Sequence, residues 1–173
     1  MKLGNADMMY QYLSLGGKAC TFEVTYTLKN KVDVVLLEKA CNTALDAFPL
    51  WKLRPYLTED HHVIFKDNKE AAVVYEADGK HVCLGTDDTN GYLFRVMYKD
   101  NVIKLIGFHG LSDARGIMSY GTSLLYYYLT SIGANIDTTD IYTVENTRDV
   151  DAVTELLSER CSKEIVEDID LLP

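Results

Sequence analysis

One histidine and one aspartate of this chain stand four residues apart, where an expected strand gives way to an expected helix. Residues 102–108 carry apolar side chains at alternate positions, as a strand does, and end at His109. Asp113 follows a glycine-containing turn, at a position suited to open a helix. Because imidazole titrates near neutral pH, a histidine at a strand end with a carboxylate nearby is a candidate for acid–base chemistry. Taken alone, these five residues also fit a loop histidine followed by a helix N-cap.

Alternation and helical spacing predict the elements that must position this pair. A strand is expected at 20–28, and a helix at 33–47 begins at Asp33 and ends before Pro49. Residues 92–98 and 101–108 read as an antiparallel hairpin, and a helix follows over 114–131. The weaker expected segments are short strands within 51–58, 61–66 and 71–77 and helices at 5–14 and 150–166. This order favours an α+β fold, with helices packed on one face of a mainly antiparallel sheet.

Composition and charge exclude several classes of protein. A content of 47% hydrophobic and 25% charged residues is that of an ordinary globular domain. No run approaches the roughly 18 apolar residues that span a bilayer, and the start of the chain lacks a signal-peptide core, so we expect a cytoplasmic protein without a membrane partner. Residues 1–136 have 15 acids and 14 bases, whereas residues 137–173 have 11 acids and 3 bases. An acidic chain without a basic patch argues against nucleic acid as a partner.

The remaining reactive side chains have simpler interpretations. His61 and His62 fit a half-exposed strand pair better than a ligand or base, and Tyr126–Tyr128 fit helix packing with exposed phenols. The cysteines are scattered, with no histidine at metal-ligand spacing, which predicts free thiols and no metal: Cys20, Cys41, Cys83 and Cys161.

The segment Phe108–Gly116 resembles the H-x-x-x-D motif of the chloramphenicol acetyltransferase-like acyltransferase superfamily. That group includes peptide-synthetase condensation domains, alcohol acetyltransferases and the plant BAHD enzymes. The resemblance extends to the order of elements: the helix at 33–47 with Phe48-Pro49-Leu50, then Gly91–Val96, then the strand, histidine, aspartate and Tyr/Leu-rich helix. It covers roughly residues 1–132 and implies a chloramphenicol acetyltransferase-like N-terminal lobe.

The resemblance also assigns roles to individual residues. His109 matches the catalytic histidine of the family, and Asp113 matches its structural aspartate. In the family this aspartate faces away from the imidazole and pairs with a basic side chain. Lys52, Arg54 and Arg95 are the candidates for that partner, and Lys52 is favoured because its place resembles that of the family's arginine.

Two positions differ from the family pattern. Phe108 stands where condensation domains have a second histidine, which points to small-molecule acyl transfer rather than peptide condensation. Ala114 stands where a glycine usually follows the aspartate, and Gly116 comes two residues later.

The resemblance implies an acyltransferase. An acyl group would pass from a coenzyme A or carrier-protein thioester to the hydroxyl or amine of a small-molecule acceptor, with His109 as general base. The thioester is a substrate, and no permanently bound cofactor is expected. Residues 1–132 would form the N-terminal lobe, and residues 133–173 an acidic linker and helix leading to a second lobe outside this chain.

Further expectations follow from a site shared between two lobes. The chain alone should be nearly inactive, and apolar groups exposed on the lobe-facing surface could drive self-association. Two alternatives remain open: a non-catalytic lobe of the same fold that docks a partner or carrier protein, and an unrelated α+β binding domain.

Overall fold

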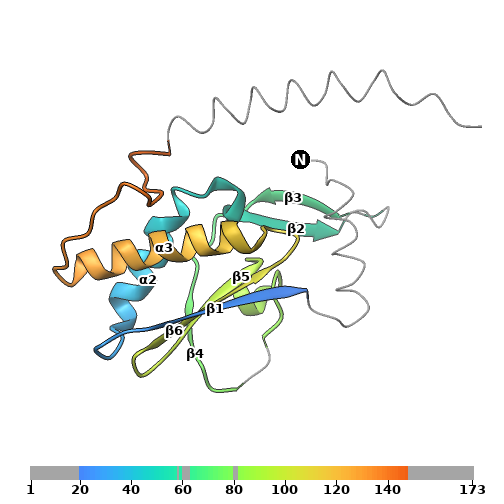
Figure 1. Ribbon diagram of the computed structural model, residues 1–173. Coiled ribbons are helices and arrows are strands. Elements are labelled where there is room, and N and C mark those ends of the chain that lie inside the picture. The colour runs from blue at the N-terminus through green and yellow to red at the C-terminus, as the bar shows by residue number, and fades with distance from the viewer. Residues whose placement is uncertain (1–19, 58, 60–62, 80–81, 148–173) are drawn as a thin grey trace, which may run out of the picture.

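Two helices lie against a four-stranded sheet, and a separate two-stranded ribbon stands beside them (Figure 1). The computed structural model describes residues 20–57, 59, 63–79 and 82–147. In chain order the elements are β1 (Thr21–Thr27), α2 (Val34–Leu45), the 3-10 helix η1 (Pro49–Lys52), β2 (Leu53–Leu57), β3 (Val63–Asp67), β4 (Val74–Glu76), the 3-10 helix η2 (Asp87–Thr89), β5 (Phe94–Lys99), β6 (Val102–Phe108) and α3 (Ala114–Ser131).

The four-stranded sheet has the order β1-β6-β5-β4. Its first three strands are antiparallel, with Val24 opposite Leu105 and Phe94 opposite Gly107, while β4 runs parallel to β5. Strands β2 and β3 form the ribbon. The α+β fold with a mainly antiparallel sheet is therefore confirmed, and so is the predicted hairpin of β5 and β6. The parallel edge strand was not predicted.

Alternation along β6 separates a helix-covered face of the sheet from the opposite face. Ile103, Leu105 and Gly107 are buried, whereas the residues between them are half-exposed. A Cβ atom added at Gly107 would lie 2.9 Å from the Ile117 side chain of α3. The odd-numbered side of β6 therefore faces the helices, and glycine at position 107 lets α3 approach the sheet closely.

Helix α2 begins and packs as its sequence predicts. The Asp33 carboxylate accepts a hydrogen bond from the Leu36 N–H (3.1 Å) and so caps the first turn. Leu37 and Cys41 are fully buried on the expected apolar face, followed by Ala44. Burial raises the pKa of the Cys41 thiol to about 12, although a hydrogen bond with Tyr120 partly offsets that rise.

Helix α3 completes the core with an aromatic cluster. Tyr120 is fully buried, and its ring stacks on Trp51 with 4.4 Å between the centroids. Phe48 and Phe94 meet the same ring near edge-on, each within 5.5 Å. Aromatic pairs in these geometries add about 0.5–1.5 kcal/mol each beyond the area they bury. The cluster ties η1, β5 and α3 together behind the strand that leads to His109.

The structure corrects some details and confirms others. Residues 49–52 form a 3-10 helix, where a strand was expected from Trp51 onward, because Pro49 favours a helical first turn. The predicted packing of the tyrosine run is confirmed, but its phenols are not all exposed as expected: Tyr128 is buried and accepts a hydrogen bond from the Asp33 N–H, and Tyr127 accepts one from the Val144 N–H. The expected helices at 5–14 and 150–166, and His61 with His62, lie outside the described residues.

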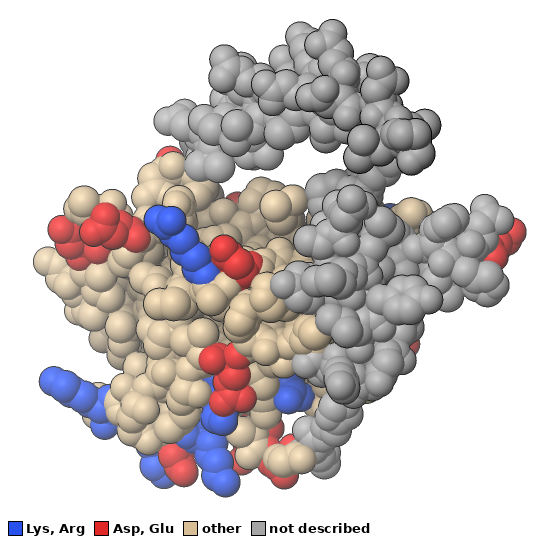
Figure 2. Space-filling model, turned by 45° about the vertical axis from the view of Figure 1, so that its right-hand side comes forward, with Lys and Arg blue, Asp and Glu red and all other residues tan. Residues whose placement is uncertain are grey.

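Surface charge is mixed on the face shown in Figure 2, where acidic and basic side chains intersperse around a broad uncharged area. Within the described ranges, no helix is long and apolar enough to cross a bilayer. Those same ranges contain no group of three His, Cys, Asp or Glu side chains that could hold a metal ion.

Candidate active site

His109 directly follows β6, at the end of the sheet where β1 begins. Its N–H donates a hydrogen bond to the Cys20 carbonyl (2.8 Å), which continues the β1–β6 ladder past the last strand residue. Its ring packs on Phe22 of β1, with 4.2 Å between the ring centroids and 41° between the planes. The backbone of His109 is thus held by a hydrogen bond to the residue before β1, and its imidazole packs on an aromatic ring of β1.

A tight turn carries the chain from His109 to α3. The Leu111 N–H donates to the Phe108 carbonyl (3.0 Å) and closes the turn. A Cβ atom at Gly110 would lie 2.5 Å from the Phe108 ring, so only glycine fits without displacing that ring. The turn holds the backbone on both sides of His109.

Asp113 is the N-cap of α3. Its carboxylate accepts a hydrogen bond from the Gly116 N–H (2.8 Å), and its carbonyl accepts one from the Ile117 N–H (3.1 Å). The side chain is exposed. The local role of Asp113 is therefore to start the helix, and through the helix start it fixes the turn that follows His109.

Gly116 has a steric role in the same turn. A Cβ atom at this position would lie 1.8 Å from the Ser112 hydroxyl oxygen, and its amide is the donor that Asp113 accepts. Any larger residue at position 116 would push the Ser112 side chain out of place. Gly116 therefore allows the close packing of this turn.

The predicted pairing of Lys52 with Asp113 is wrong. Lys52 forms an ion pair with Asp46 at the C-terminal end of α2. Asp46 is six residues away in the chain and lies at the helix end that η1 follows, so Lys52 reaches it locally. Among the described residues, Asp113 forms no ion pair with Lys52 or with either candidate arginine.

The two arginines lie elsewhere in the fold. Arg54 on β2 packs against Gly91, where an added Cβ atom would come within 2.8 Å of Arg54 Nε, and its guanidinium lies over the Tyr56 ring at 5.1 Å. Arg95 on β5 is the register partner of Ile106, so it points to the sheet face away from the helices. In the described part of the chain, Arg54 Nε, Arg95 Nε and Arg95 Nη1 are buried without a hydrogen-bond acceptor.

Two contacts of the site were not predicted from the sequence: the Phe22 ring on His109 and the Ser112 hydroxyl beside Gly116. The alternation of residues 20–28 predicted a strand, but only the β1–β6 register brings Phe22 to the histidine. The small residue at position 116 was the one available signal for the Ser112 contact.

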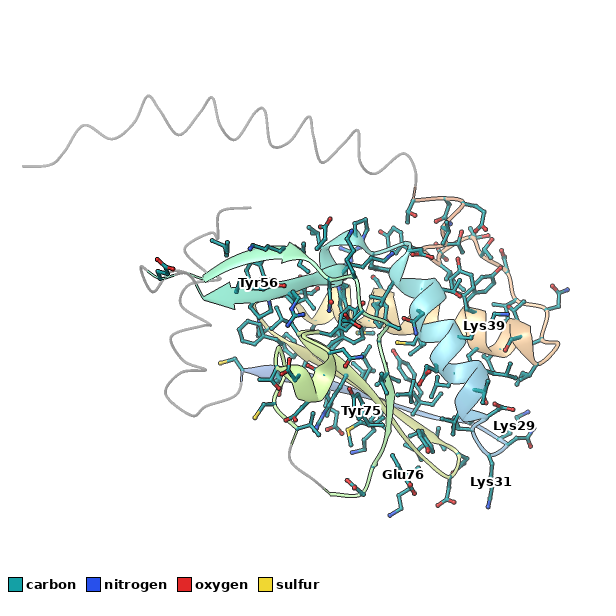
Figure 3. All side chains as sticks on the ribbon, turned by 180° about the vertical axis from the view of Figure 1, so that it is seen from behind. Lys29, Lys31, Lys39, Tyr56, Tyr75 and Glu76 are labelled. Atoms are coloured by element: carbon teal, nitrogen blue, oxygen red, sulfur yellow. The ribbon has the colours of Figure 1, made fainter. Side chains whose placement is uncertain are left out.

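Two surface hollows of the described structure lie along α2, away from His109. With volumes of about 350 and 550 Å³, they adjoin each other on the exposed side of that helix, where Lys39 lines both (Figure 3). The larger one also includes Lys52 and Tyr92, and neither is lined by His109 or Asp113. These depressions carry no part of the candidate chemistry.

Comparison with known proteins supports the fold. No family model and no curated protein sequence matches the chain. Among solved structures, it is similar to the starter condensation domain of rhizomide synthetase RzmA, with a TM-score of 0.62 and 14% identity over 95% of this chain and 46% of that one. It is also similar to polyketide synthase associated protein 5 from Mycobacterium tuberculosis (TM-score 0.58, 15% identity, 76% and 33% coverage). A third match is VibH, a condensation enzyme of nonribosomal peptide synthesis (TM-score 0.53, 12% identity, 90% and 41% coverage).

These matches show that the chain has the fold of condensation-domain lobes within the chloramphenicol acetyltransferase-like fold. The chain spans one third to just under one half of the length of these structures.

Proposed function

We propose that this chain is the lobe of an acyltransferase that carries the catalytic base. The reaction moves an acyl group from a thioester, of coenzyme A or of a carrier protein, to a hydroxyl or amine of a small-molecule acceptor. The observation that supports this proposal is the placement of His109, which follows the strand paired with β1 and precedes a helix capped by Asp113. The likeness to condensation-domain structures agrees with it.

In this proposal His109 removes the proton from the acceptor as the acceptor oxygen or nitrogen attacks the thioester carbonyl. The carbon–sulfur bond then breaks, and the leaving thiolate takes the proton back from the imidazole. A positioned general base of this kind contributes about 100- to 10,000-fold to the rate. Asp113 and Gly116 are positioning residues, because they fix the turn and the start of α3 but not the imidazole itself.

The second lobe would supply the remaining walls of the site. The matched structures are at least twice as long as this chain, and His109 lines neither of the two hollows beside α2. We therefore expect activity from the natural gene product that contains a complete pair of lobes, and little from these 173 residues alone. The alternative is a non-catalytic docking lobe of the same fold. It is supported by the same observation that the chain spans less than half of the length of the matched structures.

One assay separates the two functions. The gene product is incubated with acyl-coenzyme A or an acyl-carrier protein and a panel of alcohols and amines, and the released thiol is quantified by chromatography. Acceptor-dependent thiol release supports the acyltransferase and identifies the donor class. Saturable binding of the acyl-carrier protein without thiol release from any donor would contradict the acyltransferase and support the docking lobe.

A further inference from the structure

We propose that two copies of this chain associate edge to edge through β1, so that their four-stranded sheets join into one continuous antiparallel sheet across a twofold axis. The proposed surface shares Phe22 with the candidate active site, but the proposal does not depend on the proposed catalysis. Two features carry it: the outer backbone edge of β1 and an apolar stripe on α3 beside that edge.

Within the described part of the chain, the outer edge of β1 carries backbone groups that no other strand pairs. The His109 N–H donates to Cys20 at one end of the β1–β6 ladder, and the Leu28 N–H donates to Asn101 at the other. In an antiparallel ladder alternate residues pair, so the even-numbered residues of β1 bond to β6. The odd-numbered residues point their N–H and C=O groups outward and have no backbone partner in the described ranges: Thr21, Glu23, Thr25 and Thr27.

This edge lacks the features that usually prevent strand addition. Natural edge strands are protected by proline, lysine, a bulge or short length. Strand β1 is regular over seven residues, and Glu23 is its only charged residue. By contrast, the opposite edge strand β4 has three residues, and in the two-stranded ribbon β2 contains Pro55 while β3 carries Lys66 and Asp67. Among the described strands, β1 is therefore the one prepared to accept another strand.

The sequence of β1 is complementary to itself when two copies run antiparallel about Val24. In that register Glu23 lies opposite the partner's Thr25, and Thr21 lies opposite the partner's Thr27. A register centred on Glu23 would instead place two carboxylates face to face, which is unfavourable. The register about Val24 also pairs the whole strand, and it joins the outward N–H and C=O groups of the odd-numbered residues.

The helix-covered side of the same seam is apolar. Phe22 would lie opposite the partner's Tyr26, and Val24 opposite the partner's Val24, as non-hydrogen-bonded pairs whose Cβ atoms approach to about 4.5–5.5 Å. All three side chains are only half-buried in the single chain. Strand addition would cover them and form two aromatic pairs at the seam.

Helix α3 extends this apolar seam. Ile117 contacts Gly107 on β6, and one turn later a Cβ atom at Gly121 would lie 2.1 Å from the Tyr26 hydroxyl on β1. Residues four apart on an α-helix point in directions that differ by about 40°, always in the same sense. The residues four and eight positions after Gly121 therefore project past β1, toward its outer edge.

Those positions are apolar. Leu125 and Leu129 continue the series, and Met118 lies seven residues before Leu125 on the same side. Met118 is 58% exposed, and the two leucines are half-buried. Adjacent strands lie about 4.8 Å apart, and because α3 contacts both β6 and β1, two copies of α3 would lie near the usual 8–10 Å packing distance. The stripes of Met118, Leu125 and Leu129 would then meet above the joined strands.

Sedimentation velocity of the whole chain over a range of concentrations tests this interface. We expect a species with twice the 19.5 kDa mass of one chain, and its fraction should rise with the protein concentration. Thr25→Pro removes an outward N–H without touching the β1–β6 ladder, and it should abolish the dimer. Met118→Lys places like charges near the axis and should weaken the dimer about tenfold or more. The matched control is Val35→Lys on α2, where the native valine is 79% exposed, and it should leave the dimer unchanged.

Hydrogen exchange adds a second readout for the backbone pairing. The Glu23 and Thr25 amides should become protected as the concentration rises, whereas the Val24 amide, which bonds to β6, should be protected throughout. A wild-type monomer at all concentrations would overturn the proposal, even if another segment protected these amides. A dimer that survives Met118→Lys would overturn it as well, and this variant decides the matter if Thr25→Pro fails to fold by circular dichroism.

Discussion

The imidazole of His109 rests on the phenyl ring of Phe22, with 4.2 Å between their centroids. Phe22 is opposite Gly107 in the β1–β6 register, two residues before His109. The Phe22 ring on β1 thus supports the His109 side chain, which follows the neighbouring strand β6. The register of these two strands brings the two rings together.

The first prediction concerns this contact. In the active gene product, Phe22→Ala should lower the rate of acyl transfer, because a misplacement of the base by about 1 Å can cost about 100-fold in rate. The effect should fall on kcat more than on KM, and Phe22→Tyr, which keeps the ring, should restore most of the rate. Equal losses in kcat for the two variants would show that the aromatic contact does not position His109.

The second prediction concerns the cap of α3. Asp113→Ala should lower the free energy of unfolding by about 1 kcal/mol, because the Gly116 N–H loses its acceptor. Asp113→Asn should retain most of the stability, since an amide oxygen also accepts this bond. Urea denaturation of both variants measures the difference. If the asparagine variant proved as unstable as the alanine variant, the charge of Asp113 would have a partner beyond the cap.

A third prediction tests the close packing of Gly116 against Ser112. Gly116→Ala should destabilise the fold by about 1–3 kcal/mol, because the new methyl group overlaps the Ser112 hydroxyl. In a Ser112→Ala background the same change should cost less, since the overlapping oxygen is gone. A double-mutant cycle in urea gives the coupling energy. No coupling between the two changes would contradict the steric role of Gly116.

Thiol reactivity provides the fourth prediction. Burial raises the pKa of Cys41 to about 12, so almost no thiolate is present at neutral pH, whereas the Cys83 side chain is exposed. Iodoacetamide at neutral pH should therefore modify Cys83 in the native protein and reach Cys41 only after denaturation. Peptide mass spectrometry at timed intervals distinguishes the two sites. Rapid native modification of Cys41 would mean that α2 does not pack against Tyr120 as described.

Local signals in the sequence were sufficient to predict the main helices and strands. Asp33 and Asp113 lie just before apolar residues at helical spacing, and both cap the helices that follow. The alternation in residues 102–108 predicted β6, and helical spacing predicted the helix over 114–131, whose Ile117 and Leu124 are buried. These features depend on neighbours within one or two turns, which a single sequence displays directly.

Contacts between distant segments were harder to predict. Lys52 was assigned to Asp113 by analogy of position, but a flexible lysine side chain pairs with whichever carboxylate the fold brings near, and that is Asp46. The parallel pairing of β4 depends on a crossover between distant segments, which alternation does not reveal. The Phe22–His109 contact needs the strand register, and that register is a property of the assembled sheet.

The most direct test of the central claim is single-turnover acyl transfer by the gene product with His109 replaced. His109→Gln and His109→Ala should each lower the rate about 100- to 10,000-fold, while circular dichroism and the unfolding transition stay close to those of the wild type. His62→Ala serves as the matched control and should leave the rate unchanged. Wild-type turnover in either His109 variant would contradict the assignment of His109 as the catalytic base.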